Sequence, residues 1–345
     1  MYRKVLLMLV LCTLGLAVAA CGSDDEEPAS SGGGSEESAE KLKVGLVTDI
    51  GGLDDRGFNQ LAYEGLKRAE KDFGVEIRAI TSTKGSDYIP NLTTLARQKY
   101  DLIVANGFLM AEATEKMANT FKDAQFAIID ASAEGMKSKP KNVHGLLFKE
   151  NEIGYVVGYM AGLYTKDKGD EKVVSVVGGQ KVPAVDAYLA GYAAGAKAAD
   201  SGIKVLTDYS QSFTKQATCK EIALDQISQG SQVVFAAAGG CGLGSLDAAK
   251  QEQRQAIGVD KEQGFLGPQM MTSAIKKVDA AVYDAVEQMQ KKTYKGGVDT
   301  VYDIKSGGVG LGKVSAAGKP FLPEVEQVQK DIADGKVTDI PSQPQ

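Results

Sequence analysis

The chain has 345 residues, 43% of them hydrophobic and 24% charged, and 45 Asp and Glu against 39 Lys and Arg give a formal net charge of −6. An acidic balance disfavours nucleic acids, because phosphate binding needs clustered Lys and Arg, so we expect no nucleic-acid partner. A folded body of about 300 residues typically divides into two domains.

Residues 1–21 are predicted to be a lipoprotein signal peptide. Arg3 and Lys4 precede the apolar run 5–11, and small residues then lead to Cys21. This order indicates a secretory signal, since a membrane span needs roughly 20 strongly apolar residues. The stretch 18–21 resembles a lipobox, so we expect acylation of Cys21 and anchoring at the extracytoplasmic face of the cell membrane. A plain cleaved signal is the alternative.

Residues 22–41 are predicted to be a flexible linker. From Gly22 to Glu40 the sequence contains Ser, Gly, Ala, Pro and acidic residues but no large apolar side chain. Such a segment cannot bury enough surface to offset its ordering entropy. The folded body is therefore expected to begin near residue 42.

From residue 42 onward, short β-branched runs alternate with longer segments of helical period, which predicts βα units around parallel sheets. Strands are expected at 43–48, 75–81, 102–105, 126–130 and 143–148, with helices beginning near Gly57, Tyr88 and Ala111. A second set of strands follows at 173–177, 204–209, 233–237 and 255–259, with helices beginning near Pro183, Thr214 and Leu243.

The two sets resemble each other, as an internal repeat would. The predicted fold class is α/β, with two doubly wound parallel-sheet lobes joined by a hinge. After a strand at 270–275, residues 276–292 read as one amphipathic helix, and a strand near 300–305, a Gly-rich turn and a polar helix at 323–334 follow. We expect residues 42–149 plus 276–294 in the N-terminal lobe and 150–275 plus 295–345 in the C-terminal lobe.

Ligands of such sheets bind beyond the carboxyl ends of the strands. Asp49, Asp130 and Asp260 each end a predicted strand, and ionised Asp only accepts hydrogen bonds. They suit either a metal or a ligand rich in hydroxyl and N–H donors. Phe58 and Phe213 occupy matching loops of the two lobes and predict a slot for a flat ring, although packing of either ring into its own lobe is the alternative.

Enzymatic chemistry has little support in the sequence. His144, the single histidine, lies in an apolar strand and is expected to be structural, and no serine sits in a G-x-S-x-G elbow. Ligand spacings for a metal are absent too. The glycines at 239–244 lack the Gly-Lys-Ser/Thr ending of a P-loop, so they read as a backbone-donor loop for a neutral ligand or as a plain tight turn. We expect no enzyme, cofactor or metal.

Cys219 and Cys241 remain after Cys12 is cleaved off with the signal and Cys21 takes lipid. In an oxidising compartment they either form a disulfide or stay as two buried thiols, because sequence does not supply the Cα separation that a bond requires.

Six spaced motifs occur in order between Lys41 and Asp303: TDIGGLDDRGFNQ, LAYEGL, DYSQSF, FAAAGGCGLG, IGVDKEQ and TSAIKKVDAAV. Together they resemble the basic membrane protein (Bmp) family of nucleoside-binding lipoproteins. The resemblance implies a periplasmic-binding-protein type I fold that serves an ABC transporter.

The resemblance also implies site residues. The base would stack on Phe58 and bond to Asp49 and Asn59, and Phe213 would close its other face. Asp260 and Lys276 would bind the sugar, Gly239 and Gly240 would supply backbone groups, and Asp130 and Asn106 would make secondary contacts.

These features predict a monomeric solute-binding lipoprotein that captures a nucleoside, with a purine favoured, and delivers it to ABC permease subunits by hinge closure. A sugar or autoinducer carrier of the same fold, or an extracellular sensor, is the alternative.

Overall fold

The computed structural model describes residues 41–168 and 171–344. The predicted signal peptide, the lipidation site Cys21 and all but the last residue of the predicted linker lie outside these ranges. No helix among the described residues is long and apolar enough to cross a membrane.

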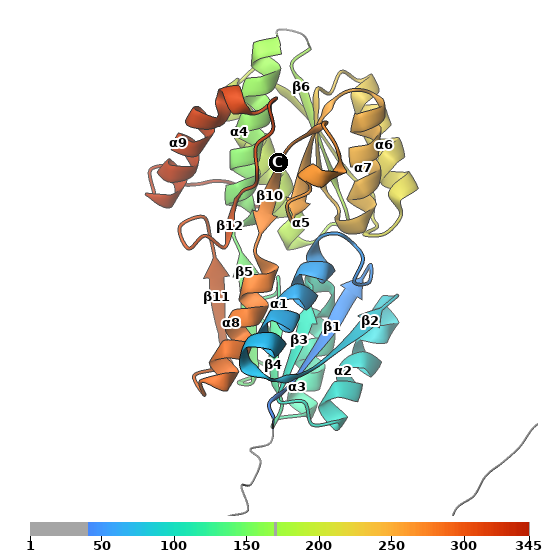
Figure 1. The fold of residues 1–345 in the computed structure, drawn as a ribbon, viewed down its shortest axis with the longest axis vertical. Helices are drawn as coiled ribbons and strands as arrows, with labels where there is room; N and C mark the ends of the chain where they lie inside the picture. The colour runs from blue at the N-terminus through green and yellow to red at the C-terminus, as the bar shows by residue number, and fades with distance from the viewer. Residues whose placement is uncertain (1–40, 169–170, 345) are drawn as a thin grey trace, which may run out of the picture. The chain divides into compact units, whose positions relative to one another are not determined.

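The first lobe is built on a parallel sheet with strand order β11-β5-β4-β3-β1-β2 (Figure 1). Its strands are β1 Lys43–Ile50, β2 Glu76–Ser82, β3 Leu102–Asn106, β4 Gln125–Ile129, β5 Val143–Phe148 and β11 Val298–Tyr302. Helices α1 Phe58–Phe73 and α8 Val278–Gln290 pack together on one face, and α2 Tyr88–Arg97 and α3 Ala111–Thr120 pack on the other. Short 3₁₀ turns, Gly85–Asp87 and Phe108–Met110, precede α2 and α3.

The second lobe repeats this topology with strand order β12-β10-β9-β8-β6-β7, in which β12 alone runs antiparallel to its neighbour. Its strands are β6 Val173–Gly178, β7 Lys204–Tyr209, β8 Val233–Ala237, β9 Gln255–Asp260, β10 Met270–Lys276 and β12 Val309–Leu311. Its helices are α4 Glu150–Lys168, α5 Pro183–Ala199, α6 Gln216–Ser228, α7 Gly239–Gln251 and α9 Leu322–Ala333, with 3₁₀ turns at Gly264–Leu266 and Lys319–Phe321. The predicted fold of two doubly wound lobes is confirmed.

Helix α4 was not among the predicted helices, because it is apolar on most of its circumference and shows little amphipathic period. It packs directly against α5 through glycines. A Cβ on Gly158 would lie 2.1 Å from the Tyr192 carbonyl oxygen, and one on Gly195 would lie 2.0 Å from that of Tyr155. The backbones of α4 and α5 are therefore in direct contact, which fixes the position of α5 against α4.

The described chain passes between the lobes at Lys149, at Lys277 and through residues 303–308. The first two crossings are bonded to the third or to the strand end before it: Lys149 N donates to Tyr302 O, at the end of β11, at 2.9 Å, and Lys277 N donates to Gly308 O at 2.9 Å.

Two expectations about this region need correction. Strand β11 pairs with β5 and lies in the first sheet, although 295–345 was assigned to the second lobe. The predicted helix 276–292 starts only at Val278, because Lys276 is the last residue of β10 and is held there by buried carboxylates.

Candidate ligand-binding cleft

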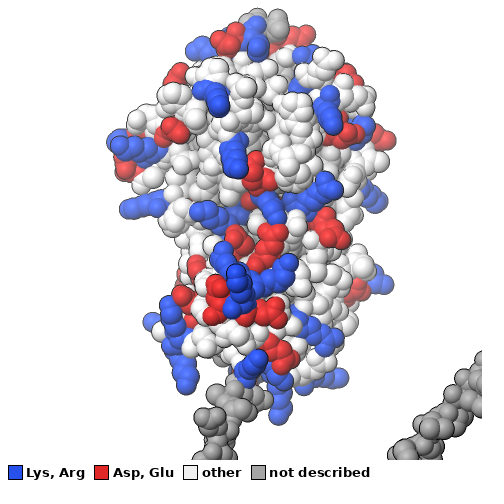
Figure 2. Space-filling view, viewed as in Figure 1, with Lys and Arg blue, Asp and Glu red and all other residues white. Residues whose placement is uncertain are grey.

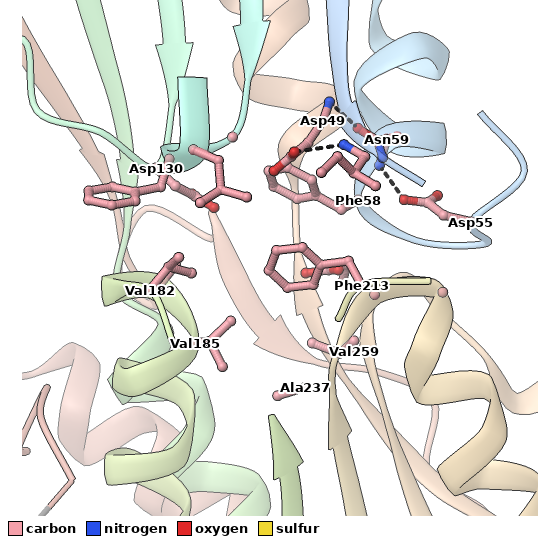
Figure 3. A pocket seen from close by; sticks show the side chains of 18 of the residues that line it. Asp49, Asp55, Phe58, Asn59, Asp130, Val182, Val185, Phe213, Ala237 and Val259 are labelled. Carbon is pink, nitrogen blue, oxygen red and sulfur yellow. Dashed lines mark hydrogen bonds between the residues drawn. The ribbon is translucent and has the colours of Figure 1, made fainter. Parts of the chain in front are cut away.

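The cleft lies between the lobes, at the carboxyl ends of their strands (Figure 3). Nine of the ten predicted ligand-binding residues line it: Asp49, Phe58, Asn59, Asp130, Phe213, Gly239, Gly240, Asp260 and Lys276. The tenth, Asn106, is buried behind Asn59. The lining includes the ends of six strands, β1, β3, β4, β8, β9 and β10, and the starts of helices α1, α5 and α7, as expected for parallel sheets.

A network of polar side chains organises the first-lobe wall. The Oδ1 atom of Asn59 accepts from Asp49 N at 3.0 Å and from Asn106 Nδ2 at 2.9 Å, so Asn106 orients Asn59. Tyr88 donates its hydroxyl to Asp49. Burial raises the pKa of Asp49 to about 6, partly offset by the Tyr88 bond.

Asp55 fixes the start of α1 and was missed from the sequence. Its carboxylate accepts from Gly57 N at 3.0 Å, Asn59 N at 2.8 Å and Gln60 N at 3.1 Å, which satisfies free donors of the first helical turn. Phe58 and Asn59 are therefore presented to the cleft at a fixed angle. An acidic residue just before a helix start is the signal that could have identified it.

Phe58 and Phe213 face each other across the cleft from opposite lobes (Figure 3). Phe213 lies against Gly179, where a Cβ would come within 2.4 Å of its ring. Its carbonyl oxygen accepts from Cys241 N at 2.9 Å. Cys241 and Cys219 form a disulfide with a Cα separation of 5.7 Å, which joins the first turns of α6 and α7 beside Phe213.

The glycine-rich segment 239–244 is the first part of α7 rather than a loop, which corrects the predicted helix start near Leu243. Gly239 adopts φ +55°, which favours glycine. A Cβ on Gly240 would lie 3.3 Å from Phe213 O, so the absence of side chains lets the helix begin directly at the cleft.

Asp130 and Asp260 occupy matching positions at the carboxyl ends of β4 and β9. Both adopt left-handed backbone conformations, with φ values of +65° and +64°. This region is uncommon for residues other than glycine and concentrates at functional sites. Burial raises the pKa of Asp260 to about 7, against the opposing effect of Lys276.

Lys276 connects the lobes through buried ion pairs. From the end of β10, its Nζ lies 2.7 and 2.8 Å from the Asp130 carboxylate oxygens of the first lobe and 2.8 Å from Glu150 Oε1 of the second. Burial alone would lower the pKa of Lys276, but the surrounding carboxylates outweigh it and raise the pKa. Three carboxylate oxygens thus surround an ammonium group that has three donors, so the sugar contact expected of Lys276 would require the exchange of one of these bonds.

Glu150, the first residue of α4, was not among the predicted site residues. An acidic residue in the first turn of a helix is common, so its sequence context does not indicate a binding role. Burial of Glu150 raises its pKa to about 7, opposed by Lys276. At the rim a more exposed pair, Lys261 Nζ to Glu64 Oε1 at 2.6 Å, also joins the lobes. Elsewhere on the face in Figure 2, acidic and basic side chains are interspersed.

Across 41–168 and 171–344, no group of three or more His, Cys, Asp or Glu is placed to hold a metal ion. His144 lies on β5 outside the cleft lining, where its Nε2 is 2.8 Å from Thr300 Oγ1.

Helix α5 supplies a further wall that sequence reasoning overlooked. Val182, Val185 and Tyr188 line the cleft from the second lobe, and Phe108 does so from the first. The helix start at Pro183 was predicted, but the face that α5 turns toward the cleft depends on its packing against α4.

Comparison with known proteins places this architecture in a family. Residues 41–340 match the family model described as ABC transporter substrate-binding protein PnrA-like, or Bmp. An ABC transporter nucleoside-binding protein of Lactococcus lactis is 33% identical over 323 residues, covering 87% of this chain and 89% of that protein. A CD4+ T-cell-stimulating antigen of Listeria monocytogenes is 34% identical over 353 residues, covering 96% of each.

Among solved structures, an ABC transporter solute-binding protein of Aeropyrum pernix superposes with a TM-score of 0.78 at 25% identity, covering 87% of this chain and 94% of that one. A solute-binding protein of Conexibacter woesei shares the fold, with a TM-score of 0.69. The chain belongs to the Bmp family of ABC transporter substrate-binding proteins.

Proposed function

We propose that this protein captures a nucleoside, with a purine favoured, between its two lobes and delivers it to an ABC permease. The observation that carries the proposal is the pair Phe58 and Phe213, which face one cleft from opposite lobes beside carboxylates at strand ends. An aromatic pair suits a flat base, and carboxylates suit hydroxyl and N–H donors. The Lactococcus lactis relative, named as nucleoside-binding, supports the same ligand class.

Each lobe contributes different contacts. The first lobe presents Phe58, Asn59 and Asp49 to the base, and the second lobe brings Phe213 and Asp260 to the other side. A ligand favours closure only through its additional contacts in the closed state, here those with the second lobe. Permease subunits would recognise that closed form.

The proposed location is the extracytoplasmic face of the cell membrane, with a monomeric body held by lipid on Cys21 and residues 22–40 as tether. The support comes from the lipobox-like sequence before Cys21 and from relatives in Pyrococcus species that are named lipoproteins.

Isothermal titration of residues 41–345 with adenosine, guanosine, inosine, cytidine, uridine and ribose tests the proposal. We expect tight binding of at least one nucleoside and none of ribose. Since stacking on an aromatic contributes about 1–3 kcal/mol per base, Phe58→Ala and Phe213→Ala should each weaken binding roughly 5- to 150-fold.

Phe73→Ala is the matched control, because Phe73 ends the same helix as Phe58 and packs against Tyr283 away from the cleft. It should leave affinity unchanged. Silence toward all nucleosides in ligand-free, refolded protein would refute the proposal and favour a sugar or autoinducer carrier or a sensor.

A further inference from the structure

Tyr188 places a buried hydroxyl at the cleft, close to the Asp260 carboxylate. The residue lines the cleft from α5 and is 4% exposed, and its hydroxyl makes no hydrogen bond of full geometry within the part of the chain that the structure describes, although Asp260 lies beside it. A buried hydroxyl left unpaired costs about 1–3 kcal/mol, so such groups in native proteins call for an explanation. One turn later Tyr192, which does not line the cleft, reaches Val233 O at 3.5 Å.

The ring of Tyr188 is held rigidly. It packs edge-on against Phe235 with centroids 5.8 Å apart. Its backbone is pressed by α4, since a Cβ on Gly154 would lie 2.6 Å from Tyr188 O. The place of the hydroxyl in the cleft is therefore set by the packing of its ring and backbone.

The surroundings of this hydroxyl are acidic. Burial, then the nearby carboxylates of Asp260, Glu150 and Asp130, raises the pKa of Tyr188 well above its ordinary value. The group stays a neutral hydroxyl that both donates and accepts, whereas an ionised carboxylate only accepts. Asp260 and Tyr188 thus offer complementary hydrogen-bonding capacity at one point of the second-lobe wall.

We propose that the Tyr188 hydroxyl and the Asp260 carboxylate together bind the 2′,3′-diol of a ribonucleoside, which makes Tyr188 a specificity-determining residue. One sugar hydroxyl donates to Asp260, and its neighbour exchanges a hydrogen bond with Tyr188. A site built to bond a substrate hydroxyl rejects analogues that lack it, because its own buried groups are then left unpaired. The inference rests on the proposed nucleoside function and extends it to a preference for ribose over deoxyribose.

The test compares Tyr188→Phe with the wild type by titration with adenosine, 2′-deoxyadenosine and 3′-deoxyadenosine. We expect the variant to lose about tenfold in affinity for adenosine, the equivalent of about 1.4 kcal/mol, and to lose less than twofold for one of the deoxy analogues. Tyr192→Phe is the matched control, because it removes a buried hydroxyl from the same helix outside the cleft. It should leave all three affinities unchanged.

Equal losses for all three ligands, or no loss for any, would overturn the inference, since the hydroxyl would then act on packing or not at all. A wild type that binds adenosine and both deoxy analogues within twofold of one another overturns it without any variant. If the wild type binds no nucleoside, the proposed function itself fails, which is a separate and recognisable result.

Discussion

Replacing Lys276 with Met would remove the positive charge at the centre of the cleft. The Lys276 side chain is 2% exposed, and its ammonium contacts Asp130 and Glu150 at 2.7–2.8 Å. Those carboxylates would remain buried without their cation. Breaking a buried ion pair from one side typically costs about 3–5 kcal/mol, so we expect a loss of that size in the free energy of unfolding at pH 8.

The loss should depend on pH in a defined direction. The pKa of Glu150 is already raised to about 7 by burial, and loss of the adjacent cation raises it further. A carboxyl group with a raised folded-state pKa contributes stability that is present at low pH and lost as pH rises through that pKa. Lys276→Met should therefore be less destabilising at pH 5.5 than at pH 8.

Urea unfolding followed by circular dichroism at both pH values measures this. Adding Glu150→Gln to Lys276→Met should recover part of the stability at pH 8, because one uncompensated charge is removed. Lys291→Met is the control, since its pair with Glu287 is exposed and should contribute less than about 0.5 kcal/mol. Equal effects of the two lysine substitutions, or a pH-independent loss in Lys276→Met, would contradict a buried ion pair of this strength.

Two further outcomes are expected. If the ligand needs ionised Asp260, whose pKa burial raises to about 7, adenosine should bind about tenfold more weakly at pH 6 than at pH 8; titration showing stronger binding at pH 6 contradicts this. The disulfide between Cys219 and Cys241 closes a loop with a sequence separation of 22 residues, so replacing both cysteines with Ser should lower the free energy of unfolding by about 3 kcal/mol. Dithiothreitol should likewise lower the denaturant midpoint of the wild type, and an unchanged midpoint would contradict this expectation.

The alternating order of strands and helices could be predicted because the hydrophobic periodicities of strands and helices differ, and because each lobe repeats the same order of elements. Polar residues at strand ends, such as Asp49, Asp130 and Asp260, were identifiable for the same reason: parallel strands bring their carboxyl ends to one edge of the sheet. Aromatic residues in matching loops also carried a local signal. These features depend on short stretches of sequence, so they could be predicted.

Other features depend on packing between distant segments. The pairing of β11 with β5, the buried contact of Lys276 with Glu150 and the disulfide all join residues far apart in the chain. Helix α4 shows little amphipathic period in its sequence because it is buried on most sides. Its glycines allow close contact with α5 and so determine which face of α5 lines the cleft. The two lobes and most of the residues at their junction follow from local patterns of sequence. The pairing of charges there, and the position of Tyr188 among them, depend on the folded chain, because burial and charge pairing arise only when distant segments pack together.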